Sequence, residues 1–139
     1  MDFVATKVDD CRWIDIRRYS DTRGYLSVIE GNIDIPFEIK RIYYLYQVPG
    51  ASRGEHAHKQ LSQLMFATSG SVRVTLNDGK RKKSFVLDCP WKGLLVKPGL
   101  WRTLDNFSDN SVLMVLASEK YEPDDYIRDY QEFLKFKGL

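Results

Sequence analysis

Short segments in which apolar and polar residues alternate fill most of the chain and constrain its fold more than any other feature. These segments are rich in β-branched and aromatic residues, and an alternation with a period of two is typical of β-strands. The clearest are residues 25–30, 39–48, 63–68, 71–76, 84–87, 93–96 and 111–118. Turn signals such as Ser69-Gly70, Asn77-Asp78-Gly79 and Pro98-Gly99 separate them. Many short strands at regular spacing indicate a β-sandwich or a β-barrel.

The alternation stops after Pro123. Asp124 or Asp125 can cap a helix, and apolar residues then recur at helical spacing. They are Tyr126, Ile127, Tyr130, Phe133 and Leu134, followed by Lys137. We therefore predict one amphipathic helix that extends to the C-terminus. A chain of 139 residues without an internal repeat or linker is also expected to form one domain over residues 1–139.

The composition argues against two classes of partner. The net charge is only +2, and the one basic run, residues 80–83, follows a turn signal, so we predict a solvated hairpin tip rather than a nucleic-acid surface. The longest apolar run, residues 112–117, is far shorter than the roughly 20 residues of a membrane-spanning helix. We expect neither a nucleic acid nor a membrane as partner.

Cysteine usage and the start of the chain predict the compartment. Cys11 and Cys89 belong to no metal-binding spacing and are expected to be free thiols. The first residues lack the pattern of a signal peptide. Both observations fit a reducing environment, and we expect a cytoplasmic protein.

Both histidines of the chain lie in one segment, Arg53-Gly54-Glu55-His56-Ala57-His58-Lys59. If this segment is extended, the two imidazoles project from the same face. An HxH pair alone is a weak signal, because two surface histidines can have this spacing by chance. The spacing around it is more specific, since Gly50, the two histidines, Gln63 and Gly70 reproduce the first motif of the cupin superfamily.

Two positions of the cupin pattern argue against a bound metal. Most cupins have a metal-binding glutamate at the position of Gln63, and metal cupins have their third histidine at the position of Arg102. A guanidinium has no lone pair to give to a metal, so an ion would have only two imidazoles and an amide as ligands. We therefore predict no metal and no other cofactor. The imidazoles, with an ordinary pKa of about 6.5, are instead expected to transfer protons.

The segment around Arg41 predicts the charge of the substrate. Arg41 and Tyr43 share a strand face with apolar neighbours, although a paired arginine and a core tyrosine would give the same pattern. Arg23, Arg53 and Arg102 lie near turns or near the histidines. Several guanidiniums could converge on phosphate oxygens, so we expect an anionic substrate, most simply a diphosphate.

Together these motifs resemble the dTDP-4-oxo-6-deoxy-D-glucose 3,4-ketoisomerases, a family of the cupin superfamily. The resemblance covers nearly the whole chain and rests on residues 21–24, 35–37, 39–44, 53–59, 115–118 and 125–130. It implies an all-β, cupin-type jelly-roll barrel with a short C-terminal helix. It also implies a homodimer that exchanges N-terminal strands, for which the alternating residues 3–19 are suited, and a dTDP-linked 4-oxo-6-deoxy sugar bound beside the histidines.

The resemblance also implies a reaction. A proton on C3, acidified by the C4 ketone, is removed to give an enediol that is reprotonated at C4, so the product is a dTDP-3-oxo-6-deoxyhexose. Such a product leads to a 3-amino-3,6-dideoxy sugar, as found in lipopolysaccharide O-antigens or S-layer glycans.

Roles are carried over by motif position. His56 and His58 would be the acid–base residues, with His58 as the base that faces the reacting carbons, and Tyr43 would complete the catalytic set. The expected substrate-binding residues are Arg23, Arg41, Arg53, Lys59, Gln63 and Arg102.

One position bears on the product. Many members resembling this sequence have a histidine where Arg102 stands, and the family divides over a galacto or gluco configuration at C4. Arg102 favours the gluco product, whereas Arg23 matches the other subgroup.

Two alternatives share the expected barrel. One is an enzyme similar to the dTDP-sugar 3,5-epimerases, which are longer and pair their histidine base with a buried aspartate; no comparable His–Asp arrangement is evident in the sequence. The other is a sugar-binding cupin without catalysis. The position of the ketone in the product distinguishes the first, and solvent exchange into the sugar distinguishes the second.

Overall fold

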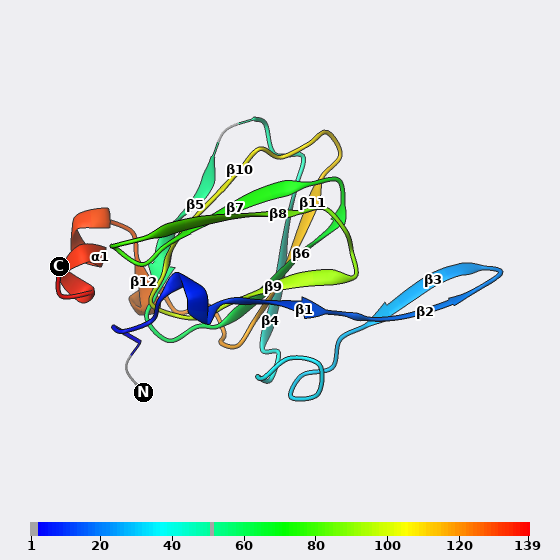
Figure 1. The fold of residues 1–139 in the computed structure, drawn as a ribbon, viewed down its shortest axis with the longest axis horizontal. Helices are drawn as coiled ribbons and strands as arrows, with labels where there is room; N and C mark the ends of the chain where they lie inside the picture. The colour runs from blue at the N-terminus through cyan, green and yellow to red at the C-terminus, as the bar shows by residue number, and fades with distance from the viewer. Residues whose placement is uncertain (1–2, 51) are drawn as a thin grey trace.

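The computed structural model describes residues 3–50 and 52–139 and consists mainly of antiparallel β-sheet (Figure 1). In chain order its elements are η1 (Val8–Asp10), β1 (Arg12–Asp15), β2 (Arg17–Asp21), β3 (Gly24–Val28), β4 (Arg41–Tyr46), β5 (Arg53–His58), β6 (Gln63–Ser69), β7 (Val72–Asn77), β8 (Lys82–Leu87), β9 (Lys92–Val96), β10 (Trp101–Asp105), β11 (Val112–Ala117), η2 (Pro123–Asp125), β12 (Tyr126–Ile127) and α1 (Tyr130–Phe136). Both η elements are single turns of 3-10 helix.

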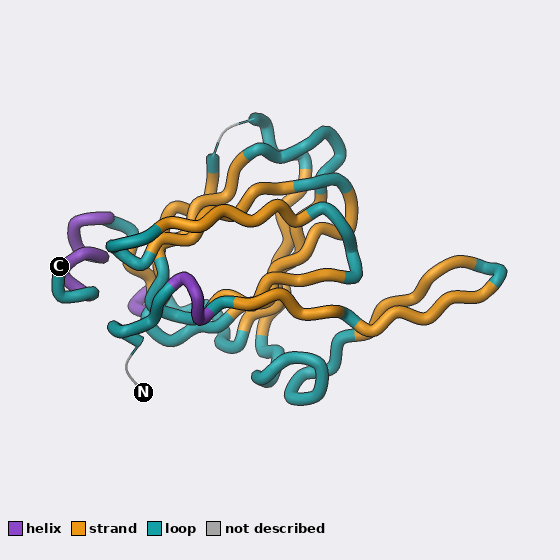
Figure 2. The backbone as a smooth tube through the Cα atoms, in the orientation of Figure 1, coloured by secondary structure: helices purple, strands orange, loops and turns teal. Residues whose placement is uncertain are grey.

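Two five-stranded sheets form the barrel. One has the strand order β1-β9-β6-β11-β4 and the other β12-β5-β10-β7-β8. Figure 2 shows the two sheets as facing layers around one interior. Strands adjacent in a sheet are mostly distant in sequence, as jelly rolls require. The prediction of an all-β, cupin-type jelly roll with a short C-terminal helix is confirmed.

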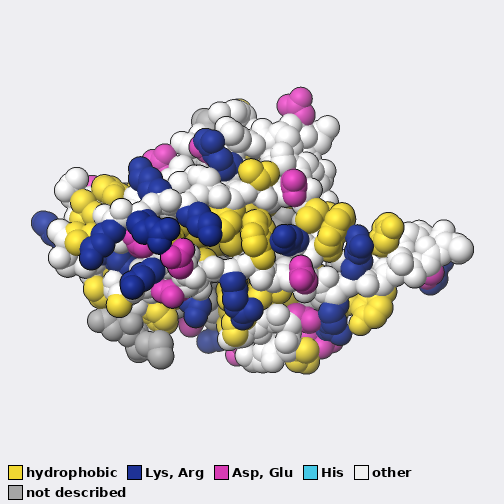
Figure 3. Space-filling model, viewed as in Figure 1, with side chains coloured by type: hydrophobic (Ala, Val, Ile, Leu, Met, Phe, Trp, Pro, Cys, Tyr) yellow, Lys and Arg dark blue, Asp and Glu magenta, His cyan; other side chains and the backbone are white. Residues whose placement is uncertain are grey.

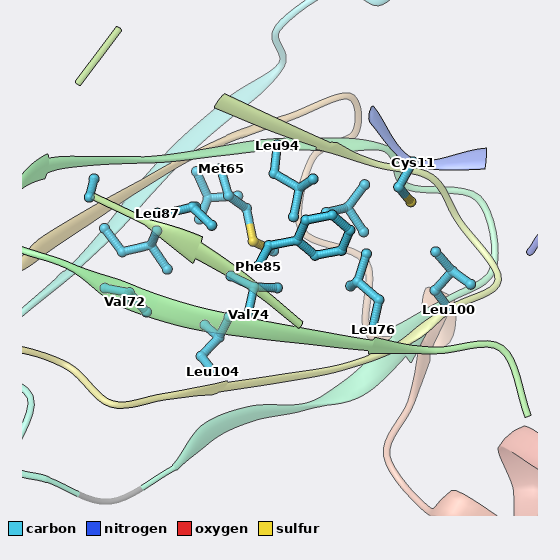
Figure 4. Close-up of a cluster of buried hydrophobic side chains, with 14 of the residues drawn as sticks. Cys11, Met65, Val72, Val74, Leu76, Phe85, Leu87, Leu94, Leu100 and Leu104 are labelled. Carbon is cyan, nitrogen blue, oxygen red and sulfur yellow. The ribbon is translucent and has the colours of Figure 1, made fainter. Parts of the chain in front are cut away.

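Alternate residues of the strands fill the interior between the sheets. On β7, Val72, Val74 and Leu76 are fully buried, and they pack against side chains from the opposite sheet such as Met65 and Leu94. Figure 4 shows these side chains meeting in one cluster with Phe85, Leu87 and Leu104. The period-two alternation of the sequence therefore does place one face of each strand in a shared apolar core.

The hairpin of β2 and β3 extends away from the barrel (Figure 1). Three of its large side chains, those of Tyr19, Tyr25 and Leu26, are exposed. The segment over residues 3–19 was expected to offer a strand to a second chain. Within it, β1 pairs with β9 of the same chain, and only β2 belongs to the projecting hairpin.

The C-terminal helix begins later than predicted. Tyr126 and Ile127 do not belong to it; they form β12, which pairs with His58 and Ala57 at the edge of the second sheet. Asp124 and Asp125 lie in η2, and Asp129 is the N-cap residue of α1. Hydrogen bonding to an open sheet edge therefore prevails over the helical spacing of the sequence.

Three further features bear on smaller expectations from the sequence. The turn between β7 and β8 is a hairpin tip at which Lys80 and Arg81 are exposed, and Figure 3 shows Lys and Arg side chains interspersed with Asp and Glu on this face. Cys11 and Cys89 are free, and burial raises the pKa of Cys11 to about 11, so its thiol stays protonated. Among the described residues, no helix is long and apolar enough to span a bilayer.

Candidate active site

The two histidines meet in the barrel interior at the C-terminal half of β5. Their Nε2 atoms lie 3.1 Å apart, and the ring planes are perpendicular. His56 is 9% exposed and His58 only 2%. The extended conformation expected for the HxH segment is therefore present, and it brings the two imidazole rings into contact with each other.

A β-bulge at Gly54 lies just before this pair on β5 and sets the direction of the two side chains. Gly54 has a φ of +68°, and the register between β5 and β10 shifts beside it. A Cβ atom at this position would lie 3.1 Å from Leu104. Only glycine combines this backbone conformation with so close an approach, so the bulge depends on Gly54.

A cavity of about 580 Å³ opens in front of His56. It is lined by Arg41, Tyr43, Tyr44, Leu45, Tyr46, Arg53, Gly54, Glu55, His56, Arg102, Leu104, Tyr126 and Arg128. His58 is not among the lining residues. The rings of His56 and Tyr126 pack against it, and the assignment of His58 as the base that faces the reacting carbons stays a prediction.

Arg102 joins the pair from the neighbouring strand β10, where it is directly opposite His56. Its Nη2 and Nε atoms lie 2.9 and 3.2 Å from Nε2 of His56, and its Nη1 donates to Oε1 of Gln63. A guanidinium can only donate hydrogen bonds. Nε2 of His56 therefore acts as the acceptor, and the neutral ring carries its hydrogen on Nδ1.

Gln63 stabilises this arrangement through hydrogen bonds to Arg102 and Tyr43. It is 2% exposed, and its Oε1 also accepts a hydrogen bond of 3.2 Å from the Tyr43 hydroxyl. Gln63 does not line the cavity, so it holds Arg102 and Tyr43 in place. Among the described residues there is no cluster of three His, Cys, Asp or Glu side chains that could hold a metal.

Two guanidiniums at the cavity have no anionic partner. No carboxylate among residues 3–50 and 52–139 lies within ion-pair distance of Arg41 or Arg102. Nε of Arg41 is buried without a hydrogen bond to any described residue, while its Nη2 donates to the Tyr126 hydroxyl. Buried cations are normally paired, so the cavity is suited to an anion.

Sequence reasoning missed Tyr126 and Arg128. Both line the cavity, and the guanidinium of Arg128 lies 4.3 Å from the centroid of the Tyr126 ring. These residues were assigned to an amphipathic helix, in which they would have had no site role. The recognisable signal was their place in the segment 125–130 that carries the family resemblance.

A His–Asp pair is also present, contrary to the expectation from the sequence. Oδ2 of Asp125 lies 3.5 Å from Nδ1 of His58, on the side away from His56. The two residues are 67 positions apart by their numbers, and η2 brings them together by leading into β12 beside β5. No local pattern could have indicated this contact.

Burial and positive charge keep both histidines neutral. The pKa of His56 is lowered to about 2, first by burial and then by the charge of Arg102. The pKa of His58 is also lowered, mainly by burial, although the nearby carboxylate of Asp125 counteracts this. The ordinary pKa assumed for these residues therefore does not apply to the two histidines.

Three other predicted site residues lie elsewhere or at the margin. Arg53 is exposed at the mouth of the cavity. Lys59 is exposed outside it, and its backbone N–H donates to the Asp125 carbonyl. Arg23 lies at the turn of the β2–β3 hairpin, where its exposed guanidinium pairs with Asp21. The fold of one chain does not bring Arg23 or Lys59 to the histidines.

Comparison with known proteins assigns the chain to a family. The model of the family described as "FdtA: WxcM-like, C-terminal" matches residues 9–138. A TDP-4-oxo-6-deoxy-α-D-glucose-3,4-oxoisomerase from Aneurinibacillus thermoaerophilus is 45% identical over 124 residues, which cover 88% of this chain and 89% of that protein. The chain belongs to the FdtA-like family of sugar 3,4-ketoisomerases.

Solved structures of this family share the fold closely. A variant of the 3,4-ketoisomerase QdtA from Thermoanaerobacterium thermosaccharolyticum, with a histidine changed to asparagine and TDP-4-keto-6-deoxyglucose bound, superimposes with a TM-score of 0.90 at 38% identity, over 93% of this chain and 94% of that one. The TDP-quinovose 3,4-ketoisomerase WlaRB from Campylobacter jejuni gives 0.88 at 42% identity, over 92% and 99%. The family predicted from the motifs is therefore confirmed.

Proposed function

We propose that this FdtA-like protein converts dTDP-4-oxo-6-deoxy-D-glucose into a dTDP-3-oxo-6-deoxyhexose. The observation that carries the proposal is the pair of neutral, contacting imidazoles at a cavity lined by unpaired guanidiniums. Neutral imidazoles can accept a proton from carbon, and the guanidiniums can bind a sugar diphosphate. Family membership supports the same substrate class.

The arginines of the cavity are assigned two different roles. Arg41 and Arg128 lie around Tyr126 and are assigned to the diphosphate, with Arg53 at the mouth. Arg102 touches His56 and is assigned to the sugar oxygens. Negative charge develops on the C4 oxygen as the proton is removed. A fixed guanidinium beside this oxygen stabilises the enediolate and so lowers the activation free energy.

The reaction requires one proton to move between carbons and one between oxygens. The C3–H bond breaks, its electron pair forms a C3=C4 double bond, and the His56–His58 pair takes the proton. C4 then takes a proton from the pair, while O3 loses its proton and O4 gains one. His56 is the member of the pair that reaches the cavity, and His58 remains our proposed site at which the proton is held.

We still expect the product to have the gluco configuration at C4. We also expect the biosynthetic pathway to end in a 3-amino-3,6-dideoxy sugar. Arg102 supports the gluco configuration, because an arginine cannot deliver a proton at neutral pH as a histidine can. Replacing Arg102 by His is expected to alter the C4 configuration or the second proton transfer more than TDP affinity. If the change abolished TDP binding and left the product unchanged, Arg102 would be a phosphate ligand instead.

A homodimer is part of the proposal. The projecting hairpin exposes Tyr19, Tyr25 and Leu26 and carries Arg23 at its tip, so a second chain could cover these side chains and bring Arg23 to its own cavity. Changing Tyr25 to Asp should give a monomer by sedimentation at micromolar concentration. A wild-type protein that sediments as a monomer would contradict the assembly.

The activity is tested with the proposed substrate in deuterium oxide. Proton NMR should show the ketone at C3 and deuterium at C4 of the product. A ketone that stays at C4 with an inverted centre would favour the epimerase alternative. Tight TDP binding without any exchange of the C3 hydrogen would favour a sugar-binding protein. Adding an aminotransferase and determining the amino sugar would establish the C4 configuration.

The roles of the histidines are tested separately. His58→Asn and His56→Asn should each slow exchange of the C3 hydrogen, by about 10²- to 10⁴-fold for loss of a positioned base, with TDP affinity nearly unchanged. If His58→Asn exchanges this hydrogen at the wild-type rate, His58 does not hold the proton.

A further inference from the structure

The side of His58 that faces away from His56 is buried and points to a carboxylate. Nδ1 of His58 makes no hydrogen bond of ordinary length to a described residue, and its nearest charged neighbour is Oδ2 of Asp125 at 3.5 Å. This separation is long for a hydrogen bond but within ion-pair range. At this distance the carboxylate acts on His58 both as a long hydrogen-bond acceptor and through its charge, and both raise the pKa of His58.

Asp125 is held firmly in this position. Its Oδ1 accepts a hydrogen bond of 2.8 Å from the backbone N–H of Gln60, and its Oδ2 accepts one of 3.3 Å from that of Leu61. Its own backbone N–H donates to the Glu122 carbonyl. Burial alone would raise the pKa of Asp125, but His58 and these N–H groups outweigh it, so the pKa lies below its ordinary value and the carboxylate is charged.

A charged carboxylate decides between the two tautomers of His58. With the hydrogen on Nε2, the lone pair of Nδ1 would face the negative charge. With the hydrogen on Nδ1, the N–H faces it instead, and the lone pair of Nε2 points to His56, 3.1 Å away. The first tautomer would let the Nε2–H of His58 donate to Nε2 of His56, but it would also set the Nδ1 lone pair against a full negative charge. Because a full charge outweighs one neutral hydrogen bond, the second tautomer is favoured, as in other His–carboxylate pairs.

We propose that Asp125 is a positioning residue of the isomerase: it keeps the hydrogen of His58 on Nδ1, so that Nε2 of His58 can take over the sugar's C3 proton from His56, the histidine that lines the cavity. This inference rests on the proposed function. Because Arg102 makes Nε2 of His56 an acceptor as well, the resting pair has two facing lone pairs. The proton taken from C3 is shared between them, and Asp125 balances the added charge.

Other groups around His58 act in the opposite sense or are neutral. Arg102 and Arg41 lower the pKa of His58 in addition to burial, and Asp125 raises it. The remaining neighbours are the neutral ring of His56 and the ring of Tyr126. Asp125 is thus the one acidic neighbour that acts on this ring among the described residues.

The tautomer can be tested without any activity. In protein labelled with ¹⁵N-histidine, the ring-nitrogen shifts should show His58 protonated at Nδ1, and the variant His56→Asn leaves His58 as the only histidine for assignment. Asp125→Asn should shift the population toward the Nε2-protonated form. A wild-type His58 protonated at Nε2 would overturn the proposal, whether or not the protein is an isomerase.

Kinetics provide the second test, with a matched control. Asp125 lines a separate hollow of about 800 Å³ that also contains Glu119, whose carboxylate pairs with Lys40 and does not touch His58. Asp125→Asn should lower kcat by about 10²- to 10⁴-fold, the range found when an orienting carboxylate is lost or a general base is impaired, with TDP affinity within about threefold. Glu119→Gln removes the same charge from the same hollow and should leave kcat unchanged.

The pH dependence separates positioning from mere support of the fold. Protonation of His58 stops the reaction at low pH, and Asp125→Asn removes the influence that raises the pKa of His58. The acid limb of kcat should therefore move to lower pH in Asp125→Asn and stay in place in Glu119→Gln. A lower kcat with an unmoved acid limb and a lower melting temperature would overturn the proposal in favour of a structural role.

Discussion

On β6 and β10 the interior face is polar at one end and apolar at the other. Gln63 precedes Met65 on β6, and Arg102 precedes Leu104 on β10; each pair is buried and separated by one residue. At the apolar end any side chain of suitable volume can fill the space. At the polar end each group has a specific partner on another strand, as Arg102 has in His56 and Gln63.

The apolar ends and the polar ends of these strands therefore have different roles, although they belong to the same strands. Burial of apolar surface, about 25 cal/mol per Å², holds the sheets together from one end. The buried guanidinium at the other end has no carboxylate among its described neighbours, and such a group costs stability rather than adding it. Stability and chemistry should therefore respond to different substitutions.

The largest effect is expected from removing the charge at the polar end. Arg102→Met should lower kcat by about 10²- to 10³-fold, the usual loss when one donor to a developing oxyanion is removed. Because a desolvated cation is also removed, the melting temperature should stay the same or rise. A variant that melts much earlier than the wild type would show that Arg102 supports the fold, and the comparison would fail.

The converse substitution lies at the apolar end. Leu76 is fully buried in the core cluster, so Leu76→Ala should reduce the free energy of unfolding by about 2–5 kcal/mol. Urea titration measures this loss. The kcat of the molecules that remain folded should stay within about twofold of the wild type, and a large fall in kcat would show that the two ends are coupled.

A smaller effect is expected at the rim of the cavity. Arg41→Met removes a guanidinium that has no carboxylate partner among the described residues, and a hydrogen bond to a charged group contributes about 1.5–3 kcal/mol, so TDP affinity should fall roughly 10- to 100-fold. Calorimetry with TDP measures this. The matched control is Arg73→Met, because Arg73 pairs with Asp105 away from the cavity; its TDP affinity should not change.

No effect is expected from chelation. The polar end has two imidazoles, an amide and a guanidinium where a metal site would need more and stronger donors. Activity should therefore persist in excess chelator. Stoichiometric zinc, iron or manganese in the purified protein, together with activity that a chelator removes, would contradict this prediction.

The apolar end could be predicted well from the sequence, because alternation depends only on local spacing. The strands of β6, β7 and β11 were found in this way. The contact between Gln63 and Arg102 was not predicted, although both residues were selected, because it depends on which strands are neighbours. Asp125 and Tyr126 were misassigned because a two-residue edge strand that pairs with β5 is too short for its sequence to be distinguished from the first turn of a helix.

Placement relative to the cavity was the hardest feature to predict. His58 was predicted to face the reacting carbons, whereas His56 is the histidine that lines the cavity, just after the bulge at Gly54. Arg23 was selected by family resemblance and lies on the projecting hairpin instead. Neither outcome follows from residue spacing, since both depend on backbone geometry away from the residue concerned.

The bulge at Gly54 has a consequence for how this protein could diversify. The missing Cβ of Gly54 faces Leu104 at 3.1 Å, so the size of residue 104 limits how far the backbone before His56 can relax. Exchanging Leu104 for Val or Phe would shift the histidines by fractions of an ångström without changing any polar group. We therefore expect drift in sugar preference to begin at this unreactive position, which makes it the first choice for a directed-evolution library.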